Sequence, residues 1–246
     1  MKKKIIYIFL IVLFTCTLVY SLFNIINWYK DNKHTESVIK ELEDTIINVK
    51  TDNIEIEVTK QIDFNELKNK NKDTIGWIEV KNTNINYPIV QTSNNSYYLN
   101  HSFDKKYTDA GWIFLDYRNT LDDKNVIIYG HARKDKSMFG TLRNTLKKDW
   151  SSDESNHTII LYLENETRYY QVFSTYHIKT EDYYITTNFN NENDYINFLN
   201  IIKNRSNYDY DVNLTSKDKI ITLSSCYNNT DKTVLHAKLI KTETNN

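Results

Sequence analysis

The sequence predicts a mainly β domain with a few added helices, attached to an N-terminal membrane-spanning helix. From Trp77 onward, roughly eight short β-branched and aromatic runs alternate with polar clusters of Asn, Asp, Gly and Ser. This pattern is typical of a closed or sandwiched antiparallel β domain. Before them, residues 5–26 form an uncharged apolar run that is long enough to cross a bilayer as a helix.

Length and composition fit one globular domain with appendages. The chain has 246 residues, 40% of them hydrophobic, and a formal net charge of −1. This charge balance does not indicate a nucleic-acid partner. The histidines and cysteines do not have metal-ligand spacing, so we expect neither a metal nor another cofactor.

The apolar run predicts an anchor that is kept in the mature protein. It exceeds the roughly 7–15 residues of a signal-peptide core, and no small-x-small cleavage site follows it. The lysines at positions 2–4 are expected to stay cytoplasmic, and Trp28 and Tyr29 suit the membrane interface. We therefore expect a cytoplasmic tip at 1–4, an anchor at 5–26 and an extracellular remainder.

The segment after the anchor is expected to separate the membrane from the folded domain. Residues 36–50 have apolar positions at helical spacing, and residues 51–61 read as a linker. We expect an extracellular helical spacer at 27–60 and the main domain at 61–246.

Three helices are predicted within the domain. Asp63 followed by Glu66 forms a capping-box pattern for a short helix. Residues 137–147 and 192–205 each carry an apolar stripe on one helical face, which predicts packing against the core. The stripes consist of Met138, Phe139, Leu142 and Leu146, and of Tyr195, Phe198, Leu199 and Ile202.

The stretch ITLSSCYNN contains the single cysteine of the extracellular part. The other cysteine, Cys16, lies within the predicted anchor and cannot reach Cys226 to form a disulfide. Secreted domains generally pair their cysteines. The residue pattern leaves two interpretations open, a buried Cys226 that acts as a small hydrophobic residue and a nucleophilic thiol.

A nucleophilic thiol requires a base, and two histidines are candidates. His131 follows the apolar strand NVIIYG, where the end of a rigid element can present a side chain to a site. His236 lies ten residues after Cys226, in the next β run. It ranks second and is interpreted mainly as a structural residue.

Several motifs together resemble those of a class B sortase. YGH ends one strand and TLSSC ends a later one, behind an N-terminal anchor. The segment from IDFNELKNKN to NHSF, GWIFLDYRN, KSMFGTL and the helix at 192–205 extend the similarity over about residues 60–246.

The resemblance implies a fold and an activity. The fold is an eight-stranded β-barrel with an N-terminal helical region and a helix between the last barrel strands. The activity is that of a cysteine transpeptidase on Gram-positive cell surfaces. Such an enzyme cleaves an LPxTG- or NPQTN-like C-terminal sorting motif of secreted proteins, forms a thioacyl intermediate, and transfers the protein to an amine of a peptidoglycan precursor.

The resemblance also implies site residues. Cys226 would be the nucleophile and His131 the general acid and base. The substrate groove would include Asn95, Leu99, Tyr129, Ser224, Tyr184 and Ile185.

The sequence departs from the family at the arginine that follows the cysteine. Alignment from His236 backward puts Lys232 at this position. Lysine is a flexible point charge without the planar, bidentate fork of arginine. Three alternatives stay open: Lys232 is the catalytic cation, Arg133 reaches in from the other strand, or Lys232 is a solvated turn residue in a weak or inactive enzyme. Ser225 replaces the usual threonine and retains the hydroxyl.

Other functions are compatible with parts of the pattern. A papain-like peptidase would require a distant histidine after the cysteine, and an L,D-transpeptidase would have His and Gly just before it, which TLSSC lacks. The non-enzymatic alternative is a sortase-like surface domain that acts as a binding module, with Cys226 buried and inert.

Overall fold

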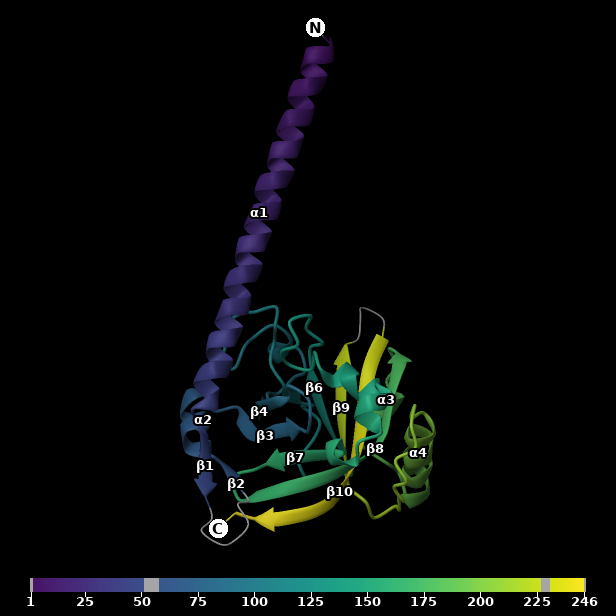
Figure 1. The fold of residues 1–246 in the computed structure, drawn as a ribbon. Coiled ribbons are helices and arrows are strands. Elements are labelled where there is room, and N and C mark those ends of the chain that lie inside the picture. Colours follow the sequence, from purple (N-terminus) through teal and green to yellow (C-terminus); the bar gives the residue numbers. More distant parts are fainter. Residues whose placement is uncertain (1, 51–57, 227–230, 246) are drawn as a thin grey trace.

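The computed structural model describes residues 2–50, 58–226 and 231–245 (Figure 1). The side chains of residues 2, 47–50, 58–59 and 226 lie outside this description. A long helix, α1 (Lys2–Glu43), extends away from a domain that contains the strands and the other helices (Figure 1).

The domain is built on a closed barrel of eight strands, which confirms the predicted fold class. Their order around the barrel is β10-β8-β7-β3-β4-β5-β6-β9. The strands are β3 (Thr74–Val80), β4 (Asn86–Val90), β5 (Phe114–Leu115), β6 (Asn125–Gly130), β7 (Thr158–Tyr162), β8 (Glu166–Lys179), β9 (Ile220–Cys226) and β10 (Asp231–Thr244). Closure leaves no open sheet edge in the barrel.

Two neighbouring pairs of strands are parallel, so the predicted antiparallel arrangement does not hold for these pairs. β4 pairs with β5, and β6 pairs with β9, in parallel. Parallel neighbours require a long connection. Here β7, β8 and α4 (Glu192–Asn204) lie in the sequence between β6 and β9. As a result, β6 and β9 end at the same end of the barrel.

The helix α4 connects β8 to β9, and its predicted apolar stripe is confirmed. Tyr195, Phe198, Leu199 and Ile202 are all buried in a cluster with residues of β8, β9 and β10. Each such side chain contributes about 1.5–3 kcal/mol by leaving water. The side chain of Asn191 caps the helix by accepting a hydrogen bond from the backbone N–H of Asp194 at 3.0 Å.

The other predicted helices are shorter than α4. In α2 (Phe64–Lys70), Asp63 is the N-cap and accepts from the Glu66 backbone N–H at 2.9 Å, as the pattern predicted. The stretch 137–147 was wrongly expected to be one helix. The helical part of this stretch is the 3-10 helix η2 (Leu142–Leu146), and α3 (Lys148–Ser151) begins just after the stretch. The stretch is not helical from its start because Met138 has φ of +51°, outside the helical region.

Three further 3-10 helices lie in the connections. They are η1 (Tyr97–Leu99), η3 (Glu154–Asn156) and η4 (Tyr183–Ile185). η1 and η4 both carry residues of the predicted substrate groove.

The last turns of α1 pack on the domain. Val38 and Leu42 are buried in the main hydrophobic core, and Thr35 Oγ1 lies 3.4 Å from Thr108 Oγ1. His34 Nε2 lies 3.2 Å from a carboxylate oxygen of Asp104. Part of the predicted spacer at 27–60 therefore contributes to the core of the barrel domain.

The predicted helical segment at 36–50 ends earlier than expected. Residues Ile46–Lys50 form β1, which pairs with β2 (Val58–Ile62) in a separate two-stranded sheet. The β-branched residues of IINVK favour a strand over a helix. Most of the predicted linker, residues 51–57, lies outside the described residues.

Candidate active site

Three strands bring the predicted catalytic residues together at one end of the barrel. In the parallel pair of β6 and β9, Gly130 is opposite Ser225, and His131 and Cys226 are the residues that follow this last pair. On the other side of β9, Lys232 is the direct antiparallel partner of Cys226. Adjacent strands are about 4.8 Å apart, so the backbones of Cys226 and Lys232 are direct neighbours, and His131 directly follows the last residue of β6. For Cys226 the structure describes this backbone position and not the side chain.

A cavity of about 240 Å³ opens at this end of the barrel. It is lined by every one of the six predicted groove residues and by His131 and Lys232. The complete lining is Asn95, Leu99, Phe114, Tyr129, Gly130, His131, Thr180, Glu181, Asp182, Tyr184, Ile185, Ser224 and Lys232.

His131 is oriented by a backbone carbonyl. Its Nε2 lies 2.7 Å from the carbonyl oxygen of Leu99. A carbonyl oxygen only accepts, so Nε2 carries a proton and donates it in this hydrogen bond. Nδ1 is then the nitrogen that can take up or release a proton in a reaction.

Gly111 packs closely against the ring of His131. It has φ of +57°, and a Cβ at this position would lie 2.6 Å from the Tyr98 carbonyl oxygen and 3.0 Å from Cδ2 of His131. Only glycine combines this conformation with such close approach. Sequence reasoning did not identify Gly111 as part of the site.

Gly130, the residue before His131, is required for space and not for a turn. A Cβ here would lie 2.5 Å from Cδ1 of Ile113 and 2.8 Å from the ring of Phe139. Close packing behind the end of β6 therefore requires glycine at this position.

An ion pair between the buried Asp116 and the partly exposed Arg118 contacts two residues that line the cavity, Tyr129 and Ile185. Tyr129 donates its hydroxyl to Asp116 Oδ2 at 2.9 Å, and Arg118 binds the same carboxylate with two nitrogens at 2.9 and 2.7 Å. Burial favours the neutral form of Asp116, but the hydrogen bonds from Arg118 and Tyr129 lower its pKa. Arg118 also donates to the carbonyl of Ile185 at 3.1 Å, which joins two walls of the cavity.

Comparison with known proteins identifies the family. Residues 78–240 match the Sortase domain. The chain is 37% identical to sortase B of Listeria monocytogenes over 218 residues, which is 85% of this chain and 87% of that protein. The chain belongs to the class B sortases.

Solved structures of sortase B share the fold of this sortase. The structure from Bacillus anthracis has a TM-score of 0.74 and 33% identity, with 87% of this chain and 99% of that chain covered. A sortase B structure complexed with triglycine has a TM-score of 0.68 and 39% identity, with 72% of this chain and 85% of that chain covered.

Two polar contacts organise the predicted groove of this sortase. Asn95 Oδ1 accepts a hydrogen bond from the backbone N–H of Tyr117 at 2.9 Å. The hydroxyls of Tyr184 and Ser224 lie 2.9 Å apart and connect η4 to β9. Asp116 and Arg118 complete this framework; the sequence contained them only as part of the similarity motif GWIFLDYRN.

Among the candidate cations of the sortase, Lys232 lines the cavity and Arg133 does not. The guanidinium of Arg133 binds the side chain of Asn32 in α1 and lies 3.0 Å from the Asp135 carboxylate. These contacts hold Arg133 at the junction between α1 and the domain.

His236 lies in the interior of the sortase and not at the cavity. It is fully buried, and burial lowers its pKa to about 3. Its two ring nitrogens contact Thr222 Oγ1 at 2.8 Å and the Tyr176 hydroxyl at 2.9 Å. The expected structural role therefore fits its surroundings.

Proposed function

We propose that this sortase is a membrane-anchored cysteine transpeptidase. It cleaves an LPxTG- or NPQTN-like sorting motif of secreted proteins and transfers them to an amine of a peptidoglycan precursor. The observation that carries the proposal is the alignment of β6, β9 and β10, which makes His131 and Lys232 the neighbours of Cys226 on its two sides.

In the proposed reaction, the thiolate of Cys226 attacks the carbonyl carbon of the scissile peptide bond. Ser224, two residues before Cys226 on β9, lines the cavity. His131, protonated at both nitrogens, gives a proton to the leaving amine, and a thioester forms. It then takes a proton from the incoming amine, which attacks the thioester and releases Cys226.

Lys232 is proposed to stabilise the negatively charged oxygen of each tetrahedral intermediate. It replaces the arginine of the family, and its backbone lies directly opposite Cys226. A positive charge near a developing oxyanion lowers the barrier without moving a proton. The contacts of Arg133 with Asn32 and Asp135 argue against the alternative in which Arg133 supplies the charge.

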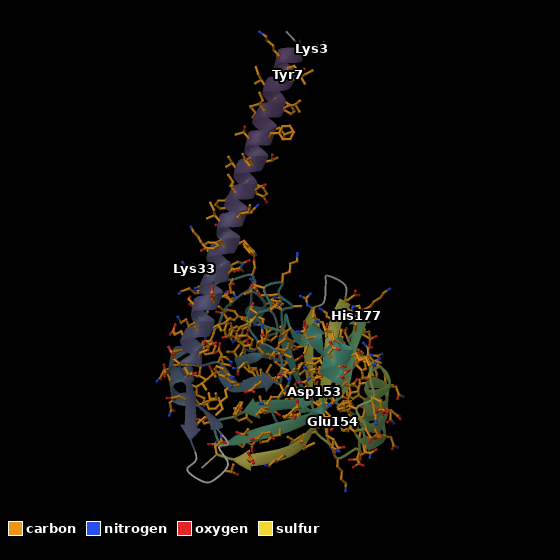
Figure 2. The ribbon with its side chains drawn as sticks, viewed as in Figure 1. Lys3, Tyr7, Lys33, Asp153, Glu154 and His177 are labelled. Atoms are coloured by element: carbon orange, nitrogen blue, oxygen red, sulfur yellow. The ribbon has the colours of Figure 1, made fainter. Side chains whose placement is uncertain are left out.

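The membrane anchor is supported by α1. The helix is long and apolar enough to cross a membrane, and its N-terminal part stands clear of the domain with side chains projecting around it (Figure 2). In Figure 1 the arrowhead of β9, the strand that ends at Cys226, points toward the side of the domain from which this part of α1 extends. We therefore propose that the catalytic end of the barrel faces the membrane surface.

The proposal is tested with a soluble form of residues 27–246, a panel of sorting peptides, and triglycine as the amine. We expect one peptide to be cleaved and joined to triglycine, with no reaction by the Cys226→Ala variant. The His131→Ala variant should lose activity by about 10²–10⁴-fold. If the parent protein processes no peptide, the catalytic proposal fails.

Two further variants test the lysine. Lys232→Ala should lower kcat by about 10²–10³-fold, the loss typical of a missing oxyanion donor, and Lys232→Arg should raise it. Arg133→Ala is the matched control and should retain parent activity. A Lys232→Ala variant with the parent rate would eliminate Lys232 as the catalytic cation.

The second candidate function, an inert binding module, predicts a different behaviour of the thiol. Cys226 would then react with an alkylating reagent only after unfolding. In the enzyme, alkylation of the folded protein should be rapid and depend on pH.

A further inference from the structure

A chain of polar side chains crosses the interior of the barrel, where apolar side chains dominate. His236 of β10 lies between Tyr176 of β8 and Thr222 of β9, with contacts of 2.9 and 2.8 Å. Thr222 Oγ1 in turn lies 2.6 Å from Oδ1 of Asn125 on β6. The four residues come from four adjacent strands of the barrel.

The hydrogen bonds in this chain have one consistent direction. The amide oxygen of Asn125 only accepts, so the Thr222 hydroxyl donates to it. Thr222 then accepts from the Nδ1–H of His236. The other ring nitrogen, Nε2, accepts from the hydroxyl of Tyr176. Each donor is used once, which is the arrangement expected of a satisfied buried network.

One end of the chain reaches the wall of the catalytic cavity. Both hydrogens of the Asn125 amide nitrogen point to backbone carbonyls, those of Thr186 at 2.9 Å and Tyr184 at 3.3 Å. Tyr184 and Ile185 line the cavity. Asn125 therefore anchors the backbone of η4 by two hydrogen bonds and is not itself a lining residue of the cavity.

The other end returns to the same segment. Arg205, which follows α4, forms an ion pair with Glu181, another residue of the cavity wall, and its charge acts on the hydroxyl of Tyr176. Its guanidinium also lies over the ring of Tyr183 at 5.3 Å. Interactions at both ends of this polar chain therefore involve one segment, residues 181–186.

We propose that Asn125, Thr222 and His236 are positioning residues that fix residues 181–186 as the wall of the substrate cavity, so that they control peptide affinity without contacting the peptide. The kinetic consequence of this proposal, a change in peptide affinity, rests on the proposed function. Its structural consequence, the order of residues 181–186, is independent of any activity.

The test uses Thr222→Val, which removes the hydroxyl at nearly constant shape, and Thr222→Ser, which retains it. The matched control is Thr233→Val. Thr233 is also a buried barrel threonine, and its hydroxyl is the one buried side-chain polar atom without a hydrogen-bond partner in the described part of the chain. Arg205→Met loosens the segment from its other end at the protein surface, where folding is least affected.

In amide hydrogen exchange, the backbone of residues 181–188 should exchange about tenfold faster in Thr222→Val and Arg205→Met, as loss of a stabilising hydrogen bond implies. The other barrel strands should keep the parent rates. In steady-state kinetics, KM for the sorting peptide should rise about tenfold while kcat changes by less than about threefold. Thr222→Ser and Thr233→Val should match the parent in both measurements.

The outcomes separate the two proposals. Faster exchange at 181–188 in a protein that processes no sorting peptide would support the positioning role and refute the proposed function. Parent-like exchange and KM in Thr222→Val would refute the positioning role. Uniformly faster exchange over all strands, with a fall in kcat and no change in KM, would also refute the positioning role. It would show that the network only stabilises the core.

Discussion

Acidification should weaken the folded state through His236, and replacement of this residue by glutamine should remove that part of the pH dependence. His236 is fully buried, and burial lowers its pKa to about 3 from the ordinary value of 6.5. Above pH 6.5 the residue is neutral in both the folded and the unfolded chain. Below this pH only the unfolded chain takes up the proton.

The contribution of His236 to the free energy of unfolding is therefore lost progressively as the pH falls from 6.5 toward 3. One pH unit within this window corresponds to about 1.4 kcal/mol, so the contribution of His236 at about pH 5 is roughly 2 kcal/mol. This is a large share of the roughly 5–15 kcal/mol that stabilises a typical domain.

Urea unfolding of residues 27–246 at about pH 7.5 and about pH 5 measures the effect. The difference in free energy of unfolding between the two pH values should be smaller by roughly 2 kcal/mol in His236→Gln than in the parent. Glutamine retains a donor and an acceptor but does not titrate. His177→Gln is the control, since this side chain is 41% exposed. An unchanged pH difference in His236→Gln would refute the reasoning.

Three other substitutions have defined outcomes. Gly111→Ala should lower kcat by at least about tenfold and the free energy of unfolding by about 1–3 kcal/mol, because the new methyl group strains the backbone and displaces His131; peptide cleavage at the parent rate would contradict this. Leu42→Ala should destabilise residues 27–246 by about 2–5 kcal/mol in urea unfolding, whereas no change would mean that α1 does not contribute to the core. Asp116→Asn should cost about 1–3 kcal/mol in the same assay by weakening the bonds to Arg118 and Tyr129, and an increase in stability would contradict it.

Much of the fold could be predicted because short-range patterns determine it. The apolar stripe of Tyr195, Phe198, Leu199 and Ile202 and the cap at Asp63 both depend on residues within one or two helical turns. The strand runs and the paired motifs YGH and TLSSC led to the barrel and to class B sortases, and the structural and family comparisons confirm both.

The remaining features depend on contacts between distant segments, which local patterns do not contain. The parallel pairing of β6 and β9 follows from how the whole chain closes into a barrel. Gly111 is adjacent to the site only because the loop before β5 packs against His131. The strand at Ile46–Lys50 replaces a predicted helix because it finds a partner in β2.

The position of β9 between β6 and β10 has a consequence for the timing of synthesis. His131 and Cys226 are about 95 residues apart, and the chain is made from its N-terminus, so β6 exists long before β9 and β10. β10 is the last strand, and it closes the barrel by pairing with both β8 and β9. A nascent or truncated chain that ends before Asp231 lacks Lys232 and leaves β9 as an open edge. The strand neighbours of Cys226 are complete only once β10 has paired with β9, so a chain that ends before Asp231 cannot assemble the proposed catalytic set.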